Sequence, residues 1–212
     1  KMSPEEHLAH IKQTIDYALS KNFTVNLYLE DWSSGMRDSR DYLFMMMDEL
    51  VKLPIKRFLL PDTLGILNPL QCVEYMRLMV RRYPNTHFDF HAHNDYDLAV
   101  SNSLAAVLSG AKGLHVTVNG LGERCGNAPL ASVQVILKDM FEAKTNIKED
   151  RLNDISRLVE GYSGIAVAPN TPVVGDNVFT QVAGVHADGD NKDKLYCNDL
   201  VPERFGRHRE YA

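Results

Sequence analysis

The amino-acid sequence predicts an α/β fold made of four consecutive strand–helix units. Two features indicate it. Short segments that alternate apolar and polar residues are each followed by a helical pattern, and reactive side chains follow the four strands. These side chains are Glu30, Asp62, His91 and Glu123, at intervals of roughly 30 residues, about the length of one strand–helix unit. The repeat predicts parallel strands, because each parallel pair needs a crossover connection.

The first unit begins with a clear helix signal. Ser3 can cap a helix that starts at Pro4, and two acidic residues follow where the helix dipole favours them. Residues 23–30 alternate apolar and polar side chains and predict a strand ending at Glu30. Helical patterning returns over residues 39–52.

The other three units are predicted in the same way, from a two-residue strand period that gives way to a helical period. Their strands are expected at residues 56–60, 86–91 and 113–119, and their helices at residues 68–83, 97–109 and from about 128. Pro84 and Gly110 close two of these helices.

A doubly wound sheet and a barrel both contain such units. Doubly wound strands are usually apolar on both faces, whereas here Asn26, Tyr28 and Glu30 share one face of a strand. Barrels carry polar residues near the C-terminal rim, where TIM-barrel active sites lie, so the sequence favours half of a TIM (β/α)8 barrel over residues 1–147. Beyond it residues 149–162 are helical in pattern and 169–189 are loop-rich, which predicts the start of a linker subdomain over residues 148–212.

Composition excludes two classes of partner. The net charge is −5 without a basic cluster, which argues against nucleic acid. No apolar run approaches the roughly 20 residues of a membrane span, so we expect no membrane association. The three cysteines are far apart and lack the spacing of a metal site or a disulfide framework. We therefore expect the protein to be located in the cytoplasm.

The sharpest chemical signal is the pair His91 and His93 at the end of the third predicted strand. Residues i and i+2 of a strand share a side, so both imidazoles can reach one cation; the alternative is two solvated loop histidines. Asn127, in the glycine-rich turn after the next strand, could add an oxygen ligand or could cap the following helix.

Several motifs in order resemble one enzyme family over nearly the whole chain. They are Leu29-Glu30-Asp31, Pro61-Asp62-Thr63-Leu64-Gly65, His91-Ala92-His93-Asn94-Asp95, Gly120-Leu121-Gly122-Glu123-Arg124-Cys125-Gly126-Asn127 and Ala183-Gly184-Val185-His186-Ala187-Asp188-Gly189. The sequence thereby resembles the C-terminal half of the barrel, and the subdomain start, of the 2-isopropylmalate, citramalate and homocitrate synthases of the DRE-TIM metallolyase superfamily. Residues 29–33, 93–98 and 200–207 are most similar to the citramalate branch.

The resemblance implies a divalent metal, zinc first and manganese or magnesium as alternatives, held by His91 and His93 with Asn127 in or near the shell. The family's further ligand is an aspartate in an Asp-Arg pair upstream of this sequence, so we expect Lys1 not to be the natural start. The resemblance gives Glu30 a role in orienting or deprotonating acetyl-CoA, where the alternative is a solvated strand-end acid. It assigns substrate binding to Thr63, otherwise a turn hydroxyl, and to Asn94. His186 would act as an acid–base group in the neighbouring subunit of a homodimer.

The implied activity is an acyltransferase that condenses acetyl-CoA with a 2-oxo acid, pyruvate or 2-oxoisovalerate, in isoleucine or leucine biosynthesis. One alternative is a metal-dependent lyase like hydroxymethylglutaryl-CoA lyase, although the turn containing Cys125 has the synthase form. Another is a non-catalytic fragment, and we expect this chain alone to show little turnover.

Overall fold

The computed structural model describes residues 2–193 and 196–211 as two compact units. The first runs to Val116 and includes Gly122–Ala128. The second contains Thr117–Leu121 and the residues from Pro129 onward.

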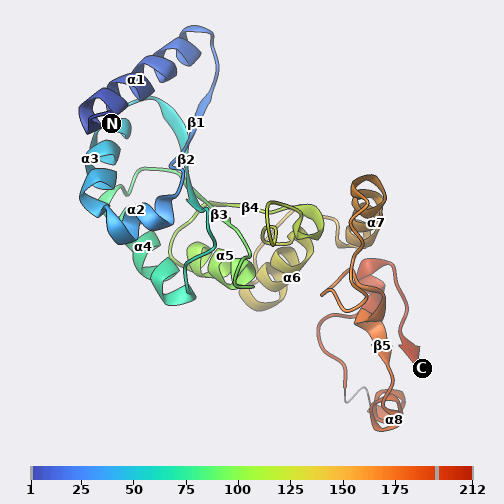
Figure 1. Ribbon diagram of the computed structural model, residues 1–212. Helices are drawn as coiled ribbons and strands as arrows, with labels where there is room; N and C mark the ends of the chain where they lie inside the picture. Colours follow the sequence, from blue (N-terminus) through green and yellow to red (C-terminus); the bar gives the residue numbers. More distant parts are fainter. Residues whose placement is uncertain (1, 194–195, 212) are drawn as a thin grey trace. The chain divides into compact units, whose positions relative to one another are not determined.

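The first unit is built on a sheet of four parallel strands in sequential order (Figure 1). The strands are β1 Val25–Tyr28, β2 Ile55–Asp62, β3 Phe88–Ala92 and β4 Gly113–His115. In register, Phe58 lies opposite Phe88 and Pro61 opposite His91. This order confirms the predicted α/β fold of consecutive βα units, half of a TIM barrel.

Helix α1 Pro4–Ser20 precedes the first strand. Helices follow each of the first three strands: α2 Trp32–Asp38 and α3 Arg40–Leu50 after β1, α4 Pro69–Arg82 after β2, and α5 Ala99–Leu108 after β3. The predicted start of α1 is confirmed by a capping box between Ser3 and Glu6, and Asn68 forms the equivalent box with Gln71 at α4. The short helix α2 was not predicted.

The two faces of the sheet differ in chemistry. Phe88 and Phe90 of β3 are buried on the face toward the helices. The rings of Phe90 and Trp32 pack edge to face there, with their centroids 6.3 Å apart. Asp89 and His91 alternate with them and lie on the opposite face, as the period of a strand requires. Apolar burial on one face therefore leaves a polar face available for a site.

The second unit contains α6 Leu130–Phe141, α7 Leu152–Ser163, α8 Gly184–Asp193, the two-residue strands β5 Thr180–Gln181 and β6 Glu210–Tyr211, and four 3₁₀ turns, η1 Val118–Gly120, η2 Glu149–Arg151, η3 Asp176–Phe179 and η4 Pro202–Phe205. Its core gathers Ala131, Val135, Leu152, Val173, Val174, Phe179 and Phe205. The rings of Phe179 and Phe205 stack with centroids 5.8 Å apart.

Two boundaries expected from the sequence are wrong. The fourth strand stops at His115 instead of reaching 119, because Asn119 adopts a left-handed conformation, φ 58°, and its amide donates to the carbonyl of Ser156. Residues 169–189, expected to be loop-rich, are mostly turns up to residue 183 but also include the start of α8, whose turns carry an ion pair between Lys192 and Asp188. The domain boundary near residue 147 stays a prediction, although α6 clusters with the second unit.

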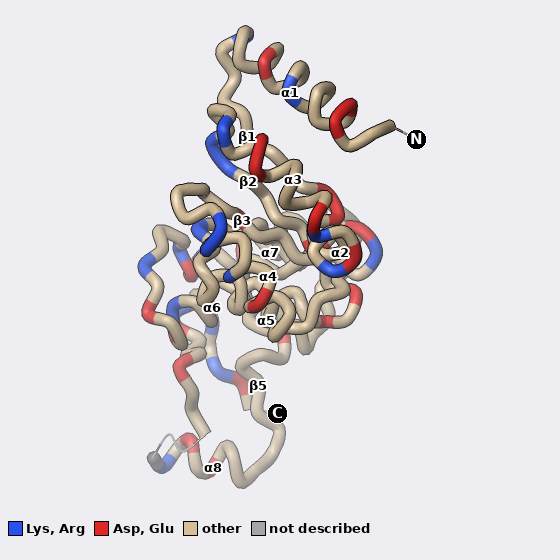
Figure 2. The backbone as a smooth tube through the Cα atoms, turned by 90° about the vertical axis from the view of Figure 1, so that its left-hand side faces the viewer, with Lys and Arg blue, Asp and Glu red and all other residues tan. Residues whose placement is uncertain are grey.

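Charged residues of both signs are interspersed along the described chain, without a continuous basic stretch (Figure 2). No helix in residues 2–193 and 196–211 is both long and apolar enough to cross a bilayer.

Candidate active site

The C-terminal ends of the four strands gather most of the predicted site residues within the first unit. Glu30 follows β1, Thr63 follows β2, His91 and His93 stand at the end of β3, and Asn127 lies in the turn after β4. Parallel strands deliver their C-terminal loops to one rim, which is why residues far apart in sequence meet here.

The two predicted metal-ligand histidines lie side by side. Their ring centroids are 5.0 Å apart with planes at 79°. The backbone of His93 is held by two contacts. Its N–H donates to the carbonyl of Asp62, and the residue forms an antiparallel β-bridge with Asn127. The Nδ1 atom of each ring is buried and has no hydrogen-bond partner among the described residues. Two buried, unsatisfied imidazole nitrogens are costly unless a ligand occupies them.

His91 is held in the neutral state. Burial, followed by the neighbouring His93 and His115, lowers its pKa from 6.5 to about 4. A neutral imidazole is the form that binds a metal.

This pKa predicts how acid affects the metal-free chain. Protonation favours the unfolded chain, in which His91 titrates near 6.5, so stability should fall as the pH is lowered from about 6.5 to about 4 and then level off for this group. His91→Gln should show a shallower loss over the same range in urea unfolding. NMR of the ring should find His91 neutral at about pH 5.5; a protonated ring there would contradict the prediction.

Glu30 and Thr63 are joined directly. The Thr63 hydroxyl donates to Glu30 Oε1 at 2.9 Å and accepts from the N–H of Asp31 at 3.0 Å. Below them the buried Asp62 carboxylate accepts the N–H groups of Ile66 and Leu67 and shapes the loop; burial raises its pKa. Thr63 is thus placed by contacts from two strands rather than by its own turn alone.

The two asparagines take different positions. The Asn94 side chain accepts from the N–H of Ala99 and donates to Asp97, so it is engaged at the start of α5, and its substrate role stays a prediction. Asn127 is buried beside His93, and Gly122 is needed there because a Cβ would come within 2.1 Å of the Asn127 amide. The alternative that Asn127 caps the next helix is wrong: α6 begins at Leu130, with Pro129 in the capping position.

A polar network on the same sheet face was not anticipated. The Tyr28 hydroxyl and His115 Nδ1 are 2.6 Å apart, and His115 Nε2 lies 3.5 Å from Asp89. Asp89, only 2% exposed, also contacts Arg57 and His87. The inward-facing polar alternation of the strands was the available signal, but the pairing depends on sheet register.

His186 lies in the second unit, exposed on α8, with its ring 4.4 Å from that of Tyr196. Its acid–base role stays a prediction.

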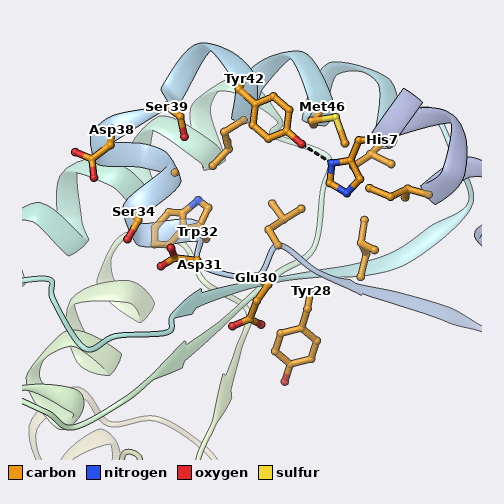
Figure 3. Close-up of a pocket in the computed structure, with 16 residues that line it drawn as sticks. His7, Tyr28, Glu30, Asp31, Trp32, Ser34, Asp38, Ser39, Tyr42 and Met46 are labelled. Atoms are coloured by element: carbon orange, nitrogen blue, oxygen red, sulfur yellow. Dashed lines mark hydrogen bonds between the residues drawn. The ribbon is translucent and has the colours of Figure 1, made fainter. Parts of the chain in front are cut away.

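A cavity of about 450 Å³ lies on the other side of β1 (Figure 3). The Tyr42 hydroxyl and His7 meet across it, whereas Glu30 and Tyr28 point away from these two residues. Glu30 and Tyr28 lie among its lining residues, whereas His91 and His93 do not.

Four parallel βα units that gather histidine, carboxylate and hydroxyl groups at one rim define the class of this unit as half of a TIM (β/α)8 barrel. Its family follows from sequence comparison. The chain belongs to the HMGL-like family, whose profile matches residues 1–159.

Curated relatives match the whole chain. It is 37% identical over 217 residues to a protein of Methanopyrus kandleri named as an (R)-citramalate synthase, covering 41% of that protein. It is 41% identical over 212 residues to a homocitrate synthase of Saccharolobus islandicus, covering 45% of it. The chain thus spans less than half the length of these relatives.

Solved structures show the same fold. An HMG-CoA lyase of Bacillus subtilis has a TM-score of 0.69 at 22% identity, over 82% of this chain and 60% of that one. An HMG-CoA lyase of Acinetobacter baumannii, in complex with coenzyme A and 3-methylmalate, has a TM-score of 0.53 at 27% identity, over 61% of this chain and 44% of that one.

Proposed function

We propose that this chain supplies the metal-binding half of the catalytic barrel of a synthase that condenses acetyl-CoA with a short 2-oxo acid. The observation that carries the proposal is the pair of imidazoles at the tip of β3 whose buried Nδ1 atoms have no partner among the described residues, beside Glu30 and Thr63. The match of this whole chain to part of curated relatives named as synthases supports this chemistry.

The side chains present fit part of a divalent-metal site. His91 and His93 would hold the ion, with Asn127 in or near its shell, and zinc suits imidazole ligands best. Within the described residues no cluster of three histidine, cysteine or acidic side chains surrounds one point, so a further ligand must come from outside this set. A bound divalent ion would polarise the carbonyl of the 2-oxo acid.

The chain's own residues supply positioning and proton transfer. The Thr63 hydroxyl would hold the substrate carboxylate, at the place where it now bonds Glu30. The Glu30 carboxylate would orient the acetyl group of acetyl-CoA and take a proton from its methyl carbon. Addition of that carbon to the 2-oxo carbon, followed by thioester hydrolysis, completes the condensation.

The finer assignments belong to the same proposal. We favour pyruvate over 2-oxoisovalerate because of the citramalate-like segments, and this choice implies a role in isoleucine rather than leucine biosynthesis. A cytoplasmic location is inferred separately, from the three separated cysteines. His186 would serve the active site of a second subunit in a homodimer. The lyase alternative draws on the solved Acinetobacter baumannii relative, which is named as an HMG-CoA lyase, and on the exposed thiol of Cys125.

The assay joins this chain to the preceding residues of the Methanopyrus relative and measures CoA thiol release from acetyl-CoA with pyruvate, 2-oxoisovalerate or 2-oxoglutarate. We expect release that depends on one of these acids and on added Zn²⁺, Mn²⁺ or Mg²⁺, and little release by the 212-residue chain alone. Cleavage of hydroxymethylglutaryl-CoA without condensation, abolished by Cys125→Ser, would favour the lyase. Robust turnover by the separate chain would overturn the account of its missing ligand.

A further inference from the structure

One arginine connects three of the rim loops. From the turn after β4, the Arg124 guanidinium binds both carboxylate oxygens of Asp95, in the loop after β3, at 2.7 and 2.9 Å. Its Nη2 also donates to the backbone carbonyl of Thr63, in the loop after β2, at 2.7 Å. The planar fork of arginine allows two parallel bonds and a third, which the compact ammonium of lysine cannot reproduce.

The local backbone is arranged around this contact. Arg124 itself has a left-handed conformation, φ 53°, which is unfavourable for a residue with a long side chain. Gly65 is close to the same point, because a Cβ on it would come within 2.9 Å of the Asp95 carboxylate. The absence of a side chain at Gly65 thus lets the loops after β2 and β3 approach each other closely beside Arg124.

Stability alone does not account for the arrangement. Arg124 and Asp95 have side chains 38% and 20% exposed, and exposed ion pairs contribute little to folding. The pair acts instead on the position of Thr63. The bond from Arg124 to the Thr63 carbonyl holds the main chain of this residue, and the Thr63 hydroxyl in turn donates to Glu30. Through the bond from Thr63 to Glu30, the segment after β1 is connected to these three loops as well.

We propose that Arg124 is a positioning residue that locks the loops after β2, β3 and β4 together and thereby sets the orientation of Thr63 and Glu30. It does not touch the reacting atoms. The inference rests on the proposed function for its catalytic consequence, whereas its structural consequence can be measured without any turnover.

The structural test uses amide hydrogen exchange on the 212-residue chain. Arg124→Ala and Arg124→Lys should each speed exchange in residues 63–66 and 95–97 at least tenfold. The matched control is Arg82→Lys, which alters another two-bond pair, Arg82 with Asp48, between α4 and α3. This substitution should leave the exchange rates of residues 63–66 and 95–97 within twofold of those in the unsubstituted chain.

The catalytic test uses the chain joined to the preceding residues of the Methanopyrus relative. Arg124→Lys should lower kcat for CoA release at least tenfold, while Co²⁺ affinity, followed by absorption, changes less than threefold because β3 holds the histidines. Unchanged amide exchange rates in these loops in both Arg124 variants, or an equal increase of these rates in Arg82→Lys, would overturn the proposed positioning role of Arg124. A parent without CoA release would refute the proposed function instead, and the exchange result would still decide the role of Arg124.

Discussion

Replacing His91 with alanine is expected to abolish metal retention and turnover together in the chain joined to the preceding residues of the Methanopyrus relative. His91 is a half-buried, neutral imidazole whose buried Nδ1 has no partner in the described chain, and His93 alone cannot hold the ion. Loss of groups that merely orient metal ligands costs about 10–100-fold in affinity or activity, so loss of a ligand should exceed about 100-fold. Elemental analysis after desalting, together with the CoA-release rate, measures both effects.

The control for this variant is another histidine on the same sheet face. The His115 ring lies 6.0 Å from that of His91, but its nitrogens are engaged by Tyr28 and Asp89. His115→Ala should therefore keep stoichiometric metal. Stoichiometric metal in His91→Ala would remove this residue from the ligand set.

Arg204→Ala should destabilise the second unit by about 3 kcal/mol, near the lower end of the range for breaking a buried ion pair. Arg204 binds both carboxylate oxygens of Asp139 at 2.9 Å and also contacts Glu149 at 3.1 Å. The two acids are only 14% and 7% exposed, so removing the cation leaves buried negative charge that Lys138 offsets only in part. Hydrogen exchange of α7 amides in increasing urea reports on this unit specifically.

The matched control is Arg151→Ala. Arg151 pairs with Asp154 three residues later, with both side chains more than half exposed, so its loss should change the free energy of unfolding by less than about 0.5 kcal/mol. Equal effects of the two substitutions would show that burial of the Arg204 cluster is not what stabilises the unit.

Local signals explain which elements were predictable. The starts of α1 and α4 depend on a capping residue and a proline adjacent in sequence, and the structure places both as expected. In contrast α2, with Ser-Ser-Gly at its centre, has weak intrinsic helix propensity and is fixed by burial of Trp32 and Met36. The early end of β4 likewise depends on the contact from Asn119 to Ser156, far along the chain.

The candidate site divides in the same way. The side-by-side histidines follow from two-residue spacing on a strand, and the sequence pattern was sufficient to predict their placement. The contacts among Tyr28, His115 and Asp89 join three strands, and those of Arg124 join three loops, so they depend on strand order and register. Periodicity within one segment contains no information on such pairings.

Among the described strands, β1 and β4 each pair with a single neighbour, which leaves one side of each without a strand partner. A closed barrel has no such margins, because every strand there has two neighbours. Backbone donors and acceptors on these margins of β1 and β4 can pair with an added extended segment. We therefore expect this polypeptide to self-associate through them during purification, and an extended peptide that pairs with both margins to suppress the self-association.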